Sequence, residues 1–248
     1  MTGGKPYRAT LLGVFAVTIL ALGWVLYHYE GEPEYLNADR TAFVALFAQP
    51  PPADSPQTRA ELDALLEVQR KRSARDVEAA RADRKTEIQR FYVALGFPEG
   101  ADPDLPLLQG LAENVEDDAR PYVRAAKEKF RRLRPYEIEP RMEPCIDRVR
   151  GDLSYPSGHA NYGYLMADLL RAMVPERERQ LLARADEFAR QRMVCGVHFA
   201  SDIEAGREGA SWLMTMLNDS AEFRNDANAA MAELRAALKL PPRVLPPR

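Results

Sequence analysis

The sequence predicts an all-α fold, a compact helical bundle that follows an apolar N-terminal segment. Two observations indicate this class. Apolar residues recur at the spacing of one helix face through most of residues 59–240. No run shows the sustained alternation of apolar and polar residues, bounded by hairpin turns, that is typical of strands. We therefore expect helices packed against helices, with no sheet.

The expected elements divide the chain into residues 1–29, a lead-in over 30–58 and an all-α domain over 59–240. The lead-in contains Pro50-Pro51-Pro52 and is expected to be extended. Residues 135–156 hold four prolines and are expected to form a loop. The expected helical tracts are 59–95, 105–133 with an interruption before Pro121, 158–173, 176–193, 199–217, and a last helix that Ser220 caps and that ends near Leu240.

Charge and composition exclude several classes of protein. The 248 residues include 34 Lys and Arg against 37 Asp and Glu, whereas proteins that bind nucleic acid polymers normally carry a basic excess. Two cysteines are too few for a zinc site of four thiolates, and no cluster has metal-ligand spacing. We therefore expect no metal and no other cofactor. Of three histidines, His28 lies near the N-terminus, which leaves His159 and His198 for imidazole chemistry.

The N-terminus carries the pattern of an export signal. Lys5 and Arg8 precede a charge-free run over residues 9–29, and about 20 apolar residues suffice for a membrane-spanning helix. The positive flank predicts that residues 30–248 lie in the periplasm, or otherwise outside the cytoplasm. Ala21-Leu22-Gly23, with small residues at its first and third positions, is a possible cleavage site of a signal peptide. The apolar run continues past them, which favours an uncleaved anchor, and a buried soluble helix fits the basic flank least well.

Outside the cytoplasm, Cys145 and Cys195 are able to form a disulfide. The bond would close a loop of 50 residues and stabilise the fold by about 4 kcal/mol in the chain-entropy treatment. Two unpaired buried thiols are the alternative. Helical faces rich in Leu and Ala are also suited to a homodimer.

Three motifs place charged or imidazole side chains at helix ends. In the first, Lys127 and Arg134 are seven residues apart, so both project from one face of a helix that Pro135 ends. Taken alone, basic residues at a helix end most often lie on a solvent-exposed face, and the helix dipole favours their positive charge there.

The second motif is Tyr155-Pro156-Ser157-Gly158-His159, a turn that leads into a helical pattern. Gly158 lets the backbone approach a ligand closely, and the amides at a helix N-terminus attract anions. Ser157 supplies a hydroxyl beside them. Taken alone, this turn is a helix N-cap with a chance histidine.

The third motif contains Arg192, His198 and Asp202, with Gly196 breaking the preceding helix. Asp202 follows His198 by four residues, so its carboxylate reaches the imidazole on one helix face. A carboxylate on one ring nitrogen selects the tautomer and leaves the other nitrogen as a nucleophile. Taken alone, such a pair is as often structural as catalytic.

Together the motifs favour phosphoryl transfer. That reaction needs positive groups around the phosphoryl oxygens, an in-line nucleophile and an acid for the leaving oxygen. The cations of the first and third motifs meet the first need, and the two histidines meet the other two.

Lys-x6-Arg-Pro, Pro-Ser-Gly-His and Arg-x5-His-x3-Asp, in this order, resemble the signature of the type 2 phosphatidic acid phosphatase superfamily. The match is closest to the bacterial class A non-specific acid phosphatases, and it extends over about residues 34–235. The resemblance implies the helical fold shared by acid phosphatases and vanadium haloperoxidases. It also implies a secreted enzyme that needs no metal and acts on small phosphorylated substrates.

The resemblance assigns a role to each motif residue. His198 would attack phosphorus to give a phosphohistidine, Asp202 would orient it, and His159 would protonate the leaving alcohol and later activate water. The residues that would bind the phosphoryl oxygens are Lys127, Arg134, Ser157, Gly158 and Arg192.

Some positions depart from the family pattern. Gln191 stands where serine is usual, Ala160 where threonine is common, and Val197 and Phe199 flank His198 where larger or more polar aromatics are frequent. None of them removes a catalytic group, so they bear on substrate preference and phosphate affinity.

The preferred hypothesis is an acid phosphatase that hydrolyses phosphate monoesters at acidic to mildly acidic pH. A phosphotransferase, a pyrophosphatase, a lipid phosphatase or a vanadate-dependent haloperoxidase would use a similar pocket. The alternative from another class is a non-catalytic helical envelope protein that binds phosphorylated ligands.

Overall fold

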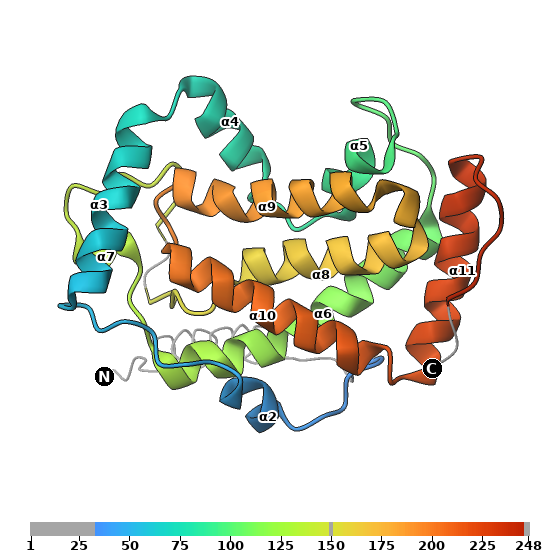
Figure 1. Ribbon diagram of the computed structural model, residues 1–248, viewed down its shortest axis with the longest axis horizontal. Coiled ribbons are helices and arrows are strands. Elements are labelled where there is room, and N and C mark those ends of the chain that lie inside the picture. Colours follow the sequence, from blue (N-terminus) through green and yellow to red (C-terminus); the bar gives the residue numbers. More distant parts are fainter. Residues whose placement is uncertain (1–32, 149–150, 246–248) are drawn as a thin grey trace, which may run out of the picture. The chain divides into compact units, whose positions relative to one another are not determined.

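A computed structural model describes residues 33–148 and 151–245, and these residues form helices and loops with no strand. The predicted all-α class is confirmed over this part of the chain. Glu34–Arg248 form one compact unit, whose elements Figure 1 labels. Its helices are α2 (Arg40–Ala45), α3 (Pro56–Lys71), α4 (Ala74–Ala82), α5 (Tyr92–Leu95), α6 (Pro106–Phe130), α7 (Pro135–Ile138), α8 (Gly158–Met173), α9 (Glu178–Val194), α10 (Ala200–Leu217) and α11 (Ala221–Ala237), with 3-10 turns η1 (Ile88–Phe91) and η2 (Pro175–Arg177).

Helix α8 is the centre of the bundle. It lies between α9 and α10 and contacts both along its length, with further contacts to α6 and α11 (Figure 1). Its side chains are buried nearly all the way round, as expected for a helix enclosed by others. Because α8, α9 and α10 are neighbours, the N-terminal ends of α8 and α10 and the C-terminal end of α9 meet on one side of the bundle (Figure 1).

A glycine allows the close approach of α10 to the start of α8. A Cβ atom at Gly206 would lie 2.6 Å from the carbonyl oxygen of Ser157 and 2.9 Å from the Cβ of Ala160. The backbone amide of Ser157 also donates to the carbonyl of Asp202 at 2.9 Å. The second and third motifs are therefore in direct backbone contact.

Residues 59–95, which were predicted as one helical tract, form several separate helices. The chain breaks after Lys71, and Ser73 forms a capping box with Asp76 that starts α4. A short hydroxyl side chain followed three residues later by a carboxylate is a helix-start signal that outweighs the apolar periodicity. The predicted interruption before Pro121 was also wrong: α6 continues through it, because burial of the flanking turns offsets the one lost hydrogen bond.

The lead-in and the proline-rich loop also differ from expectation, since each holds a short helix. Asp39 caps α2, whose Phe43 is fully buried, and α3 begins at Pro56. Helix α7 lies within the loop that follows Arg134. Ser220 caps α11 as predicted, by accepting from the amide of Phe223 at 3.2 Å.

Residues 9–29, for which we expect an anchor or a signal peptide, lie outside the described residues. Within the described ranges, no helix combines the length and the apolar character that crossing a membrane requires.

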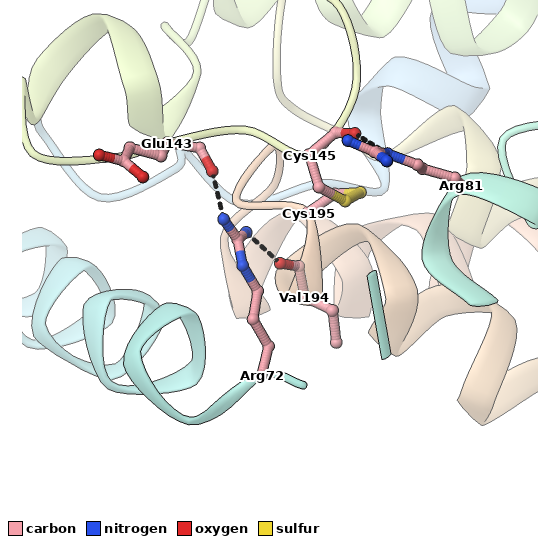
Figure 2. The surroundings of a disulfide bond; sticks show 6 residues. All are labelled: Arg72, Arg81, Glu143, Cys145, Val194 and Cys195. Atoms are coloured by element: carbon pink, nitrogen blue, oxygen red, sulfur yellow. Dashed lines mark hydrogen bonds between the residues drawn. A yellow bond between two sulfur atoms is a disulfide. The ribbon is translucent and has the colours of Figure 1, made fainter. Parts of the chain in front are cut away.

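Cys145 and Cys195 form the expected disulfide, with 4.7 Å between their Cα atoms. Figure 2 shows two arginines that brace it. Arg72 donates to the carbonyls of Val194 and Glu143, both at 2.8 Å, and Arg81 donates to the carbonyl of Cys145 at 2.8 Å. The bond thereby ties the proline-rich loop to the segment that leads into His198.

Candidate active site

His198 lies between the end of α9 and the start of α10. Gly196 turns the chain there with a φ of +65°, a conformation that glycine adopts without steric cost. Nδ1 of His198 is 3.2 Å from Oδ2 of Asp202, one helical turn along, and both side chains are fully or almost fully buried. His198 and Asp202 thus form the pair that their spacing in the sequence predicts.

Arg134 contacts the other ring nitrogen of His198. Its Nη1 lies 3.0 Å from Nε2 of His198 and donates to the carbonyl of Val197 at 2.8 Å. A guanidinium has only donors, so Nε2 must accept and must therefore be unprotonated. The ring hydrogen then resides on Nδ1, where the Asp202 carboxylate accepts it. Contacts on both sides select the tautomer whose lone pair lies on Nε2, where it accepts from Arg134 until a substrate displaces that contact.

Lys127, Arg134 and Arg192 concentrate positive charge around this histidine. Burial, followed by the charges of Arg134, Lys127 and Arg192, lowers the pKa of His198 well below its ordinary value. Burial and then Arg134 lower the pKa of Lys127 to about 8. Burial also lowers the pKa of Arg192, again with Arg134 as the next cause. The charges of all three motif cations therefore disfavour protonation of His198.

Arg192 has buried donors that no group among the described residues accepts. Its side chain is 3 % exposed, and Nε and Nη1 are buried without a hydrogen-bond partner. Buried polar groups are nearly always paired, and an unpaired one is costly. Guanidinium N–H groups that lack a protein acceptor are available to the oxygens of a bound phosphoryl group.

Ser157 and Gly158 form the N-terminus of α8. Ser157 caps the helix by accepting from the amide of Ala160 at 3.3 Å. Gly158 is the first helical residue, and the amides of a first helical turn lack an acceptor within the helix. An anion beside them would also be favoured by the helix dipole.

His159, one residue further on, is held by a backbone carbonyl and an aromatic ring. Its Nε2 lies 2.8 Å from the carbonyl oxygen of Arg84, and its ring stacks on Phe188. A carbonyl only accepts, so Nε2 carries a hydrogen and Nδ1 is the nitrogen left to exchange a proton. Burial, then the charge of Arg192, lowers the pKa of His159 to about 3.

Asp152 lies beside Arg134 and Lys127, although no motif contains it. Its Oδ2 is 2.5 Å from Nη2 of Arg134, and its Oδ1 is 4.0 Å from Nζ of Lys127. Lys127 also donates to the carbonyl of Leu153. Nothing in the sequence distinguishes Asp152 from other loop carboxylates, because its role depends on how the loop folds over the cations.

Asp202 has further partners that the sequence analysis missed. Its Oδ2 accepts from the hydroxyl of Ser154 at 2.5 Å and from the amide of Phe199 at 2.9 Å. Its Oδ1 accepts from Nη1 of Arg132 at 2.6 Å. Burial raises the pKa of Asp202, and Arg132 is the largest opposing cause. Arg132 lies between the two basic residues of the first motif, and only the fold shows that it points at Asp202.

Comparison with known proteins finds a family match over the region that holds the three motifs. The family model described as the PAP2 superfamily matches residues 116–217, which contain all three motifs. Residues 116–217 are therefore similar to the PAP2 superfamily, the family that the motifs resemble. Within that class, the protein is similar to bacterial acid phosphatases.

Three relatives carry this similarity. A non-specific acid phosphatase of Providencia stuartii is 33% identical over 147 residues, which are 58% of this chain and 59% of that protein. An acid phosphatase of Zymomonas mobilis is 27% identical over 219 residues, 85% of this chain and 78% of that protein. A non-specific acid phosphatase of Salmonella typhimurium is 36% identical over 111 residues, 42% of this chain and 43% of that protein. The chain thus spans between about two fifths and four fifths of these relatives' lengths.

A solved structure, the transmembrane PAP2-type phosphatidylglycerolphosphate phosphatase of Bacillus subtilis, is also similar. It is 16% identical with a TM-score of 0.49, covering 73% of this chain and 90% of that chain.

Proposed function

We propose that this protein is a metal-independent acid phosphatase that hydrolyses small phosphate monoesters through a phosphohistidine at His198. The observation that carries the proposal is the arrangement around that ring. Asp202 accepts at Nδ1, and Arg134, a predicted phosphate-binding residue, donates at Nε2. A phosphoryl group that bound to Arg134 would lie beside the nitrogen that attacks it. Three cationic side chains supply the positive charge that other phosphatases obtain from metal ions.

The first half-reaction forms a bond between Nε2 of His198 and phosphorus while the bond from phosphorus to the ester oxygen breaks. Nδ1–H of His198 stays on the ring, where Asp202 stabilises the positive charge that develops. His159 gives a proton to the leaving alcohol. In the second half-reaction, His159 takes a proton from water, water oxygen attacks phosphorus, and the bond to nitrogen breaks to release phosphate.

Substrate binding is needed to prepare His159 as an acid. Its pKa of about 3 reflects burial and the positive charge of Arg192. A phosphoryl dianion bound to Arg192 offsets that charge, so the pKa of His159 rises when substrate binds. The result is an acid that is protonated mainly in the enzyme–substrate complex, which favours an acidic to mildly acidic optimum.

The test is to trap the covalent intermediate with a labelled aryl phosphate. Wild type and His159→Ala are expected to yield an acid-labile, base-stable phosphoenzyme, because an aryl leaving group needs little protonation. His198→Ala is expected to yield none and to lose hydrolysis. Label at another residue, or normal hydrolysis by His198→Ala, would show that the assignment is wrong. Binding of phosphate without any turnover by the wild type would support a non-catalytic binding protein instead.

The proposal places the domain outside the cytoplasm, in the periplasm or tethered to the inner membrane. It is supported by the disulfide between Cys145 and Cys195 and by the apolar run at residues 9–29. Separating periplasmic, membrane and cytoplasmic fractions tests it, and recovery in the cytoplasmic fraction alone would contradict it.

A further inference from the structure

Glu61 on α3 is joined to the start of α10, although it lies outside the three motifs and outside residues 116–217. Its Oε1 accepts from the backbone amide of Ser201 at 2.8 Å. Its Oε2 accepts from the hydroxyl of Ser201 at 3.0 Å and from Nη2 of Arg132 at 2.9 Å. The carboxylate is 12% exposed, so water screens these contacts only weakly.

Arg132 extends this contact to the catalytic pair. Its Nη1 donates to Oδ1 of Asp202 at 2.6 Å and to the hydroxyl of Ser201 at 2.7 Å. Its guanidinium carbon lies 4.0 Å from the centroid of the Phe199 ring, which limits its movement. An unbroken series of hydrogen bonds thus runs from Glu61 through Arg132 and Asp202 to His198.

The charges along this series explain why a second carboxylate is useful. Arg132 alone would neutralise Asp202, and the negative potential at His198 would be lost. Glu61 balances the guanidinium from its other side, so the three groups together keep one negative charge. That charge stabilises the His198 ring as it becomes positive on forming a bond to phosphorus.

We propose that Glu61 is a positioning residue for the nucleophile: it holds Arg132 and the first turn of α10 so that Asp202 remains an anionic partner of His198. The inference rests on the proposed phosphatase function. It gives α3, which contributes no motif residue, a part in the chemical step.

Glu61→Gln tests the proposal because it keeps the shape of the side chain and removes its charge. One amide oxygen cannot replace both carboxylate oxygens, and the amide nitrogen would face a donor. We expect kcat for an aryl phosphate to fall about tenfold, as for loss of a hydrogen bond to a charged group. The inhibition constant of inorganic phosphate should change less than about twofold, because Glu61 does not contact Lys127, Arg134 or Arg192. Glu61→Asp should recover part of kcat.

Glu176→Gln is the matched control. Glu176 binds the buried side chain of Arg235 through two hydrogen bonds, of 2.9 and 3.1 Å, at a place unconnected to the site. The Glu176 side chain is 44% exposed against 12% for Glu61, so Glu176→Gln should lower the melting temperature less than Glu61→Gln and should leave kcat unchanged. Glu61→Gln should also have little further effect in an Asp202→Asn background, because it acts through that carboxylate.

Three results would overturn the inference. The first is an unchanged kcat in a folded Glu61→Gln protein, and the second is an equal loss of kcat in Glu176→Gln. The third is a full additional loss in the Asp202→Asn background. A wild type that hydrolyses no phosphate ester would instead refute the proposed function, and this inference with it.

Discussion

Nη1 of Arg134 lies 3.0 Å from Nε2 of His198, so a predicted phosphate-binding residue touches the predicted nucleophilic nitrogen. This contact has two consequences. It holds the ring in the tautomer that can attack, and it places positive charge where the phosphoryl oxygens would bind. Binding and chemistry therefore depend on the same arginine.

Arg134→Gln should raise the pKa of His198. After burial, the charge of Arg134 is the largest cause of the lowered pKa, so removing it favours the protonated ring. Phosphate affinity should fall at least about tenfold with the loss of a charge-assisted hydrogen bond. NMR titration of the histidine side chains and calorimetry with phosphate measure both effects. Arg141→Gln, at an exposed arginine that pairs with Glu139, should change neither. An unchanged His198 pKa in Arg134→Gln would contradict the electrostatic explanation.

Asp152→Asn should tighten phosphate binding. The carboxylate of Asp152 pairs with Arg134 and lies near Lys127, so an incoming phosphoryl group competes with it. The side chain is 37% exposed, which limits the effect to about threefold in KM and in the inhibition constant of phosphate. Steady-state kinetics measure both constants. Asp168→Asn, which removes a carboxylate paired with Arg171 on α8, is the control. Weaker binding in Asp152→Asn would instead indicate that Asp152 orients Arg134 for the substrate.

Stability should fall on acidification and recover with phosphate. The pKa of His159 is about 3 and that of His198 is also depressed, against about 6.5 in an unfolded chain. Between the two values the unfolded chain binds protons that the folded protein does not. The unfolding free energy therefore decreases as the pH falls below about 6.5, by up to about 1.4 kcal/mol per pH unit per histidine.

Melting curves between pH 7 and pH 4, with and without phosphate, test this effect. Bound phosphate should raise both histidine pKa values by offsetting the cations, and it should therefore flatten the profile. His198→Gln should show a shallower decline than wild type, and an equal slope would refute the assignment to His198.

Removing the disulfide should reduce both stability and activity. The 50-residue loop corresponds to about 4 kcal/mol in the chain-entropy treatment, and Cys195 lies three residues before His198. The double variant Cys145→Ala/Cys195→Ala should denature at lower urea concentration. Its remaining activity should also decline at a lower temperature than that of the wild type. A reducing agent added to wild type should reproduce both effects and should not alter the double variant. Equal stability of the two proteins would show that Arg72 and Arg81 suffice to hold the loop.

Much of the helical architecture could be predicted from local patterns. Residues 158–173 match α8 because a largely apolar sequence without proline follows a capping serine, and Ser220 marks the start of α11. Predictions were wrong where two local signals compete. At Ser73 the capping box outweighs the apolar periodicity, and at Pro121 tertiary burial outweighs the proline.

The candidate site likewise combines residues that the sequence predicts with contacts that only the tertiary structure shows. The sequence by itself indicated the cations and the two histidines through their motifs, and a spacing of four residues predicted the His198–Asp202 pair. The predicted helix face shared by Lys127 and Arg134 was wrong, because α6 ends at Phe130 and Arg134 precedes α7. Only the tertiary structure decided that Asp152 pairs with Arg134 and that Glu61 reaches Asp202 through Arg132. These contacts join elements that are far apart in sequence. Their geometry depends on how α3, α10 and the segment after α6 pack, and no local pattern predicts that packing.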